Sequence, residues 1–143
     1  MRLIGRIVKW GALLFLGVLA VGVIYGQVGR IADNRLAPPA SEMFTVRGHH
    51  VHVVRTGAGP RTFVLDAGLG GWSLFWGPIQ PLLSRYGQVY SFDRPGTGWS
   101  DPTAAGHDGI AAAEELDAIV QAAHIPTPFA YVGHSLGATF AQI

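Results

Sequence analysis

The stretch that decides the fold is FAYVGHSLGATF, residues 129–140. An apolar run from Phe129 to Val132 leads directly into Gly133-His134-Ser135-Leu136-Gly137, and helix-forming residues follow. This order predicts a short buried strand, a sharp turn with Ser135 at its apex, and a helix over 138–143. Glycines on both sides of the turn let it lie against neighbouring backbone, because glycine has no Cβ. We therefore expect the Ser135 hydroxyl to be exposed at the carboxyl edge of a sheet.

A serine on such a turn has the position of a nucleophile. The N–H of Leu136, at the start of the following helix, is the predicted first donor to an oxyanion that forms on an attacked carbonyl. Because the five-residue pattern also occurs by chance as a glycine-rich turn, its meaning depends on the rest of the chain.

Strands and helices alternate before this turn. Residues 43–46 and 50–56 predict a hairpin with a turn at Arg47-Gly48-His49. The elements predicted after it are a strand at 62–66, a helix ending near Tyr86, a strand at 88–92 and a helix at 106–124. The alternation predicts an α/β fold with a mostly parallel sheet. In the helix at 106–124 an apolar stripe contains Ile110, Leu116, Ile119 and Val120, and a solvated face contains Glu114, Glu115 and Asp117.

A glycine-rich loop, Asp66 to Gly71, follows the strand at 62–66. In a sheet of this kind the loop occupies the position that supplies a second oxyanion donor, and we assign that donor to the N–H of Leu69. An ordinary strand-to-helix turn is the alternative. Trp72 and Phe75, just beyond the loop, are expected either in the core or in an acyl pocket.

The loop SFDRPGTGWSD, residues 91–101, completes the pattern. With it, residues 43–143 resemble the N-terminal half of the α/β-hydrolase superfamily, whose members carry a glycine-rich oxyanion loop, an Asp-Arg-x-G-x-G-x-S loop and the serine turn in this order. The resemblance implies a serine hydrolase that acts on an ester or related acyl bond without a cofactor. It also implies that Asp93 and Arg94 hold their loop near the active site.

Two features refine the resemblance. In many relatives the oxyanion loop begins with His-Gly, whereas this chain has Ala67-Gly68 after Asp66. The resemblance therefore does not identify the subfamily or the substrate. Serine at 135 disfavours the haloalkane dehalogenase and epoxide hydrolase branches, for which the resemblance implies a carboxylate nucleophile. A peptidase, a perhydrolase and a non-catalytic binding protein of the same fold are the alternatives to an esterase.

The general base and its acid are not evident in this sequence. In this fold they follow the serine in the chain order Ser, Asp or Glu, His, and only eight residues follow Ser135. We therefore expect both beyond Ile143, in a longer protein of which this chain is a part that would be inactive alone. His50 and His52, which share one face of a strand, are interpreted as polar residues on the exposed face of the hairpin, and no metal site is predicted.

The N-terminal segment has a different character. Residues 1–35 carry five basic side chains and one acidic one, around an uncharged apolar stretch at 10–28 that is nearly long enough to cross a bilayer. The positive charges before this stretch predict a single-pass anchor with a cytoplasmic N-terminus and the hydrolase domain outside. A cleaved signal peptide, giving a secreted protein, is the alternative. The predicted division is a membrane-directing segment at 1–35, a Pro38-Pro39 linker at 36–41 and the partial hydrolase domain at 42–143.

The composition bounds the partners. The part after residue 35 has five basic and eight acidic side chains, so it offers no basic stripe for nucleic acid. The chain has no cysteine, which excludes disulfides and cysteine nucleophiles. The expected partners are membrane lipid at the N-terminal helix and a small acyl substrate.

Overall fold

The computed structural model describes residues 2–33, 41–104, 106 and 108–143, and in its first helix the side chains of residues 6 and 9–29. The chain divides into two compact units, Met1–Ala37 and Pro38–Ile143. Of the predicted linker at 36–41, all but Ser41 lies outside the described residues.

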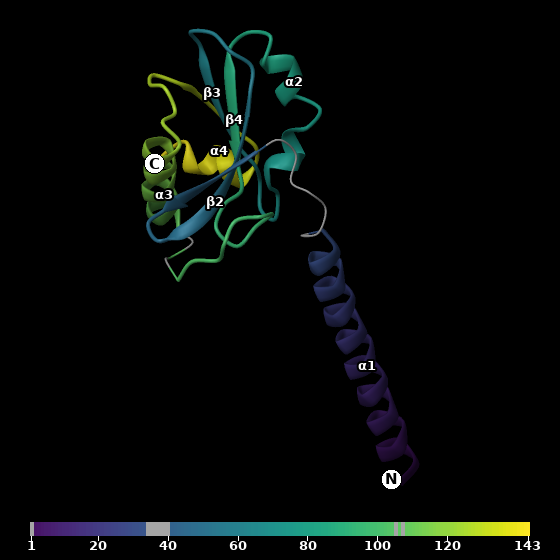
Figure 1. Cartoon of the computed structure of the whole chain (residues 1–143). Coiled ribbons are helices and arrows are strands. Elements are labelled where there is room, and N and C mark those ends of the chain that lie inside the picture. The colour runs from purple at the N-terminus through teal and green to yellow at the C-terminus, as the bar shows by residue number, and fades with distance from the viewer. Residues whose placement is uncertain (1, 34–40, 105, 107) are drawn as a thin grey trace. The chain divides into compact units, whose positions relative to one another are not determined.

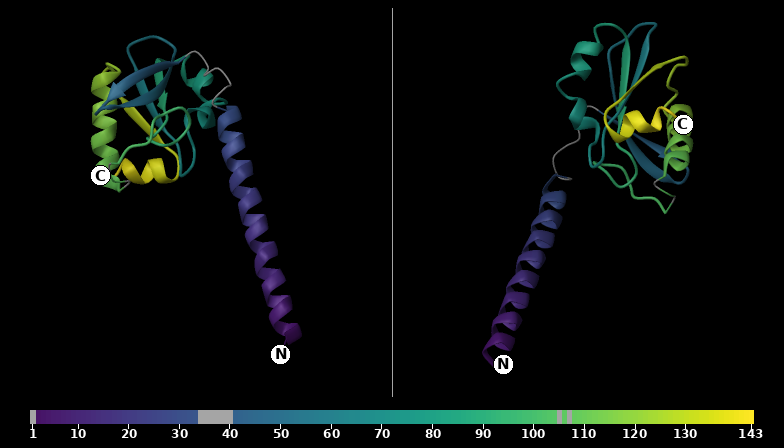
Figure 2. Two further views of the ribbon diagram at one scale, coloured as in Figure 1. Left: turned by 60° about the horizontal axis from the view of Figure 1, so that its bottom comes forward. Right: turned by 180° about the vertical axis from the view of Figure 1, so that it is seen from behind.

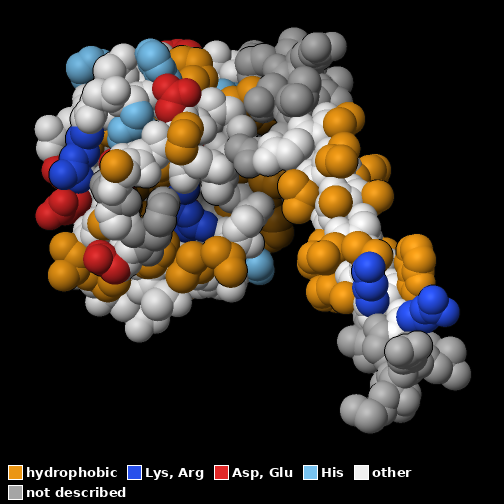
Figure 3. All heavy atoms as spheres, turned by 90° about the horizontal axis from the view of Figure 1, so that it is seen from below, with side chains coloured by type: hydrophobic (Ala, Val, Ile, Leu, Met, Phe, Trp, Pro, Cys, Tyr) orange, Lys and Arg blue, Asp and Glu red, His pale blue; other side chains and the backbone are white. Residues whose placement is uncertain are grey.

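The first unit is one long helix, α1 (Arg2–Asp33), shown in Figure 1. Its segment Lys9–Gly29 is long and apolar enough to cross a membrane, and a signal sequence has the same character. The described side chains from Lys9 to Val28 are all exposed. Figure 3 shows hydrophobic side chains along the visible face of this helix.

The second unit contains a five-stranded sheet with the order β1-β2-β4-β3-β5. The strands are β1 (Glu42–Val46), β2 (His49–Thr56), β3 (Thr62–Asp66), β4 (Gln88–Phe92) and β5 (Ala130–Gly133). β2 pairs antiparallel with both β1 and β4, whereas β3 pairs parallel with both β4 and β5. This is the predicted α/β arrangement, and it brings the carboxyl ends of β3, β4 and β5 to one edge of the sheet.

Alternating side chains of the strands build a core on each face of the sheet. Val64 and Tyr90 belong to the core that includes Ile119 of helix α3 (Gly109–Ala122). Their neighbours Leu65 and Val89 point the other way and pack with Trp76. Both faces of these central strands are therefore covered, as the apolar runs of a parallel sheet require.

The helices lie on opposite sides of the sheet in Figures 1 and 2. On one side are the 3₁₀ turn η1 (Ser73–Trp76) and the short α2 (Gln80–Leu83), and on the other is α3 (Gly109–Ala122), next to α4 (Leu136–Phe140). The helix predicted to end near Tyr86 is thus two short pieces, because Gly77 and Pro78 interrupt it. The helix predicted over 106–124 is shorter as well. The side chain of Asp108 caps its start, with a hydrogen bond from the N–H of Ala111.

The polar face predicted for α3 is wrong at one residue. Glu115 is buried, and its carboxylate lies 2.8 Å from Nε2 of His49 on β2. Conversely Ile110, predicted on the apolar stripe, is 68% exposed. The contact with His49, 66 residues away in sequence, buries a carboxylate that periodicity alone would leave exposed.

The prediction that the histidines of the hairpin are simply exposed is also wrong for His52, which is fully buried. Each of the three histidines contacts a carboxylate from another segment. His49 contacts Glu115 of α3, while His50 and His52 contact Asp101 and Asp93 of the loop that follows β4. The hairpin is therefore fastened to both α3 and that loop through its histidines.

Candidate active site

The turn at residues 133–137, called here the serine turn, joins β5 to α4. Ser135 has φ 52° and ψ −114°, a conformation that side-chain-bearing residues rarely adopt. The residue is exposed, and its carbonyl accepts a hydrogen bond from the N–H of Thr139 at 3.2 Å. The strained, exposed serine matches the geometry predicted from the sequence.

The two glycines of the serine turn are required by close backbone contacts. A Cβ on Gly133 would collide with the backbone of Gly137 and Ala138, and one on Gly137 would collide with the carbonyl of Asp66. The close approach of Gly137 to Asp66 places the start of α4 directly beside the end of β3. The N–H of His134 also donates to the Asp66 carbonyl at 3.0 Å, which fixes the serine turn beside β3.

The loop at residues 67–71, called here the oxyanion loop after its predicted role, lies directly against the serine turn. A Cβ on Gly68 would be 3.2 Å from the Cβ of Ser135, so the backbone of this loop and the serine are in contact range. Leu69 is 88% exposed. Within the described residues, neither the N–H of Leu69 nor that of Leu136 has a hydrogen-bond acceptor, so both are free to bind an oxyanion.

The loop at residues 93–101, called here the β4 loop, is held by Asp93. This fully buried carboxylate accepts hydrogen bonds from the N–H groups of Ser73 (2.7 Å) and Trp99 (2.9 Å) and contacts His52. Burial alone would raise the pKa of Asp93, but the hydrogen bonds from His52, Trp99 and Ser73 together outweigh it and leave the pKa lowered. Asp93 therefore ties the β4 loop to η1 and β2.

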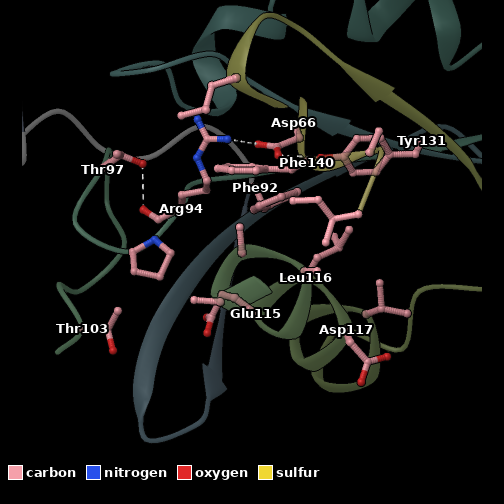
Figure 4. A pocket seen from close by; sticks show the side chains of 18 of the residues that line it. Asp66, Phe92, Arg94, Thr97, Thr103, Glu115, Leu116, Asp117, Tyr131 and Phe140 are labelled. Atoms are coloured by element: carbon pink, nitrogen blue, oxygen red, sulfur yellow. Dashed lines mark hydrogen bonds and ion pairs between the residues drawn. The ribbon is translucent and has the colours of Figure 1, made fainter. Parts of the chain in front are cut away.

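Arg94 has a different role from its neighbour. Its guanidinium donates from Nη1 to the carboxylate of Asp66 (2.8 Å) and from Nη2 to the carbonyl of Gly68 (2.6 Å). The hydroxyl of Tyr131 lies 2.6 Å from the other carboxylate oxygen of Asp66 and 3.1 Å from the carbonyl of Gly137. Figure 4 shows Arg94 and Tyr131 on either side of Asp66.

Burial raises the pKa of the Asp66 carboxyl above its ordinary value, although hydrogen bonds from Tyr131 and Arg94 oppose that shift. Burial and the adjacent carboxylate also raise the pKa of Tyr131. The sequence reasoning named Asp66 only as a departure from His-Gly and did not name Tyr131. The signal that was available is an acidic residue that ends an otherwise apolar strand, with an arginine at the corresponding end of the neighbouring strand.

A cavity of about 680 Å³ lies between the carboxyl edge of the sheet, α3 and α4. Its lining includes both predicted oxyanion residues, Leu69 and Leu136, together with Arg94. Phe75 does not line it. This side chain is 46% exposed and stacks on His134 at 4.6 Å between ring centroids, so it is neither buried core nor part of this cavity. The part of the chain that the structure describes holds no group of three metal-ligating side chains.

Comparisons with known proteins agree with this geometry. The family model described as alpha/beta hydrolase fold matches residues 61–143. RutD of Klebsiella pneumoniae strain 342, named as a proposed carbamate hydrolase, is 42% identical over 81 residues, which are 56% of this chain and 30% of RutD. The uncharacterized protein YqjL of Bacillus subtilis is 30% identical over 96 residues, 66% of this chain and 38% of YqjL.

Among solved structures, Cfl2 of Burkholderia cenocepacia has a TM-score of 0.66 and 31% identity, covering 71% of this chain and 34% of Cfl2. The chain spans about a third of the length of the curated relatives it matches.

Proposed function

Because the chain belongs to the α/β-hydrolase family, we propose that it carries the nucleophile and oxyanion hole of a serine hydrolase that acts on an ester or related acyl bond. The nucleophile is Ser135, and the N–H groups of Leu69 and Leu136 are the two oxyanion donors. The observation that carries this proposal is the strained, exposed backbone of Ser135, with the oxyanion loop packed against it.

The chemistry follows from these positions. The Ser135 Oγ attacks the carbonyl carbon, and the negative charge that develops on the carbonyl oxygen is stabilised by the two N–H groups. The acyl group remains on Ser135 when the alcohol or amine leaves, and water then releases it. The removal of the Ser135 proton requires a general base with an orienting carboxylate.

Four of the five histidines that the structure describes have other side-chain contacts. His49, His50 and His52 face carboxylates on the hairpin side of the domain, and the ring of His134 stacks on Phe75. In this fold the acid and the base follow the nucleophile in the chain order Ser, Asp or Glu, His, and we propose them in a later segment of the full-length protein.

A carbamate is a second substrate class. The similarity to RutD favours it, and a serine enzyme would attack the carbamate carbonyl in the same manner. Helix α1 is proposed to anchor the protein in a membrane with its N-terminus in the cytoplasm and the hydrolase domain outside, or else to serve as a cleaved signal sequence.

The test is covalent labelling of the full-length protein with a fluorophosphonate, which reacts with activated serines. We expect labelling and ester turnover in the wild type, and loss of both in Ser135→Ala with unchanged thermal unfolding. Ser84→Ala, whose hydroxyl bonds only to the Pro81 carbonyl in α2, is the matched control. Turnover that survives Ser135→Ala would contradict the nucleophile assignment. A folded wild type that neither labels nor turns over substrate would instead favour a binding protein. Parallel assays with short and long esters and with carbamates assign the substrate class.

A further inference from the structure

We infer that Asp66, Arg94 and Tyr131 form a positioning cluster, which fixes the orientation of the Leu69 N–H beside the serine turn. The inference rests on the proposed function, because it assigns a role to residues that act through the oxyanion loop rather than on the substrate. The three side chains come from β3, the β4 loop and β5, so they connect the carboxyl ends of the three parallel strands.

A peptide unit is planar, so a contact that fixes its carbonyl also fixes the direction of its N–H. The carbonyl of Gly68 and the N–H of Leu69 belong to the same peptide unit, and in a trans peptide they point in opposite directions. Arg94 Nη2 holds that carbonyl at 2.6 Å. An anchored carbonyl oxygen prevents rotation of the unit, and the Leu69 N–H is then directed away from Arg94.

The same cluster also reaches the serine turn. Tyr131, on the strand that leads into this turn, places its hydroxyl 3.1 Å from the carbonyl of Gly137 in α4. Asp66 accepts from both Arg94 and Tyr131 through its two carboxylate oxygens. A tyrosine hydroxyl has one proton, and the shorter contact shows it donated to Asp66. One carboxylate thus links the segment that carries Leu69, through Arg94, to the strand that leads into the serine turn, through Tyr131.

The charges of the cluster are costly to bury. The side chains of Asp66 and Arg94 are only 4% and 15% exposed. Apolar residues of similar volume often replace a buried ion pair without loss of stability, and the raised pKa of Asp66 is consistent with a carboxylate that the fold does not favour for stability alone. Orientation of the loop is the property that the pair provides and apolar residues do not.

The experiment uses the full-length protein with three variants. The double variant Asp66→Leu/Arg94→Met removes the cluster without an unpaired buried charge. Arg94→Lys keeps the positive charge but loses the two-ended fork that reaches Asp66 and Gly68 together. Arg47→Met is the matched control, because it removes an arginine–carboxylate pair, with Glu114, that lies exposed between the hairpin turn and α3.

The first measurement is hydrogen exchange at the amide of Gly71, whose N–H donates to the Gly68 carbonyl at 3.1 Å. We expect about tenfold faster exchange in the double variant and in Arg94→Lys, with unchanged exchange in β3 and β4 and with the control like the wild type. Unchanged exchange at Gly71 would overturn the inference. This readout does not depend on Ser135 chemistry, so it decides the inference even if the proposed function fails.

The second measurement is kinetic. A trifluoromethyl ketone analogue of the best substrate adds to the serine and places an oxyanion in the site. In the double variant we expect the ratio of its Ki to the substrate KM to rise about tenfold to a hundredfold, with kcat reduced and KM little changed. A purely structural role would lower stability and leave this ratio at the wild-type value. That result would overturn the inference while leaving the Ser135 assignment intact.

Discussion

The Nδ1 atom of His52 lies 2.9 Å from Oδ2 of Asp93, and both side chains are fully buried. The same carboxylate receives the N–H groups of Ser73 and Trp99, and the ring of Trp99 packs on His52 at 4.8 Å. Three segments therefore meet at one carboxylate: the hairpin, η1 and the β4 loop. Arg94, the next residue, starts from a fixed position when it reaches the oxyanion loop.

Replacement of Asp93 by Ala should be strongly destabilising. It leaves His52 and two backbone N–H groups without their acceptor in the interior, and the expected loss is about 3–5 kcal/mol in the free energy of unfolding. Urea unfolding of the full-length protein measures it. Asp101→Ala, at an exposed carboxylate that contacts His50, is the control and should change stability little. A similar small change for both variants would contradict the proposed role of Asp93.

The lowered pKa of Asp93 predicts acid sensitivity. Since the folded-state pKa lies below the ordinary value of 3.8, the contribution of this carboxylate to stability is complete above that value. It is lost as the pH falls through the lowered pKa. Unfolding free energies measured from pH 7 to pH 3 should show a loss below about pH 4. In Asp93→Asn that part of the loss should be absent. An identical pH profile in both proteins would argue against it.

The His49–Glu115 pair should contribute measurably to stability, because its side chains are only 10% and 9% exposed. A double-mutant cycle with His49→Ala and Glu115→Ala should give a coupling energy of about 1–3 kcal/mol at pH 7. The Arg47–Glu114 pair joins the same two elements, but its side chains are 47% and 59% exposed. Its coupling should be below about 1 kcal/mol. Equal couplings would show that burial does not distinguish the pairs.

A methyl group at Gly133 should disrupt the domain. Its Cβ would collide with the backbone of Gly137 and Ala138, which cannot move without opening the serine turn. We expect Gly133→Ala to be insoluble or to lose cooperative unfolding, and Gly133→Val to be worse. Gly48→Asn is the control, because Gly48 has φ 91° with open space around it and asparagine tolerates positive φ. A folded, active Gly133→Ala variant would refute the turn geometry.

Deletion of residues 1–35 should release the protein from membranes, since the apolar helix Lys9–Gly29 lies within them. Fractionation with alkaline carbonate, with and without detergent, measures this. The mass of the mature protein separates the two readings of the helix: an anchor retains residues 1–35, and a signal peptide is removed. Sedimentation of the deleted protein with membranes would reveal a second attachment site.

Local patterns were sufficient for much of the fold. The strand from Thr62 to Asp66 and the strand from Gln88 to Phe92 were predicted with their observed bounds, because apolar runs between glycine-rich breaks leave few alternatives. The serine turn was predicted with its strained backbone, since Gly133 and Gly137 admit contacts that other residues do not.

What sequence reasoning missed depends on long-range partners. Glu115 sits beside Glu114 in a polar stretch, and nothing local distinguishes the buried carboxylate from the exposed one until His49 is brought to it. The burial of the His52 side chain depends likewise on Asp93 of the β4 loop, about 40 residues later in the sequence. The role of Asp66 becomes visible only in the folded chain, where Arg94 and Tyr131 bind its two carboxylate oxygens.

The strand order has a consequence for how the protein folds. β3 is sandwiched between β4 and β5, and its partner β5 follows it by more than sixty residues. Closing so long a loop is entropically costly, and pairings of this kind form slowly. Gly68 comes into contact range of Ser135 only after that pairing. During refolding, the rate at which the protein becomes reactive toward a fluorophosphonate would then report the rate at which β5 pairs with β3. We expect this pairing to form later than the hairpin.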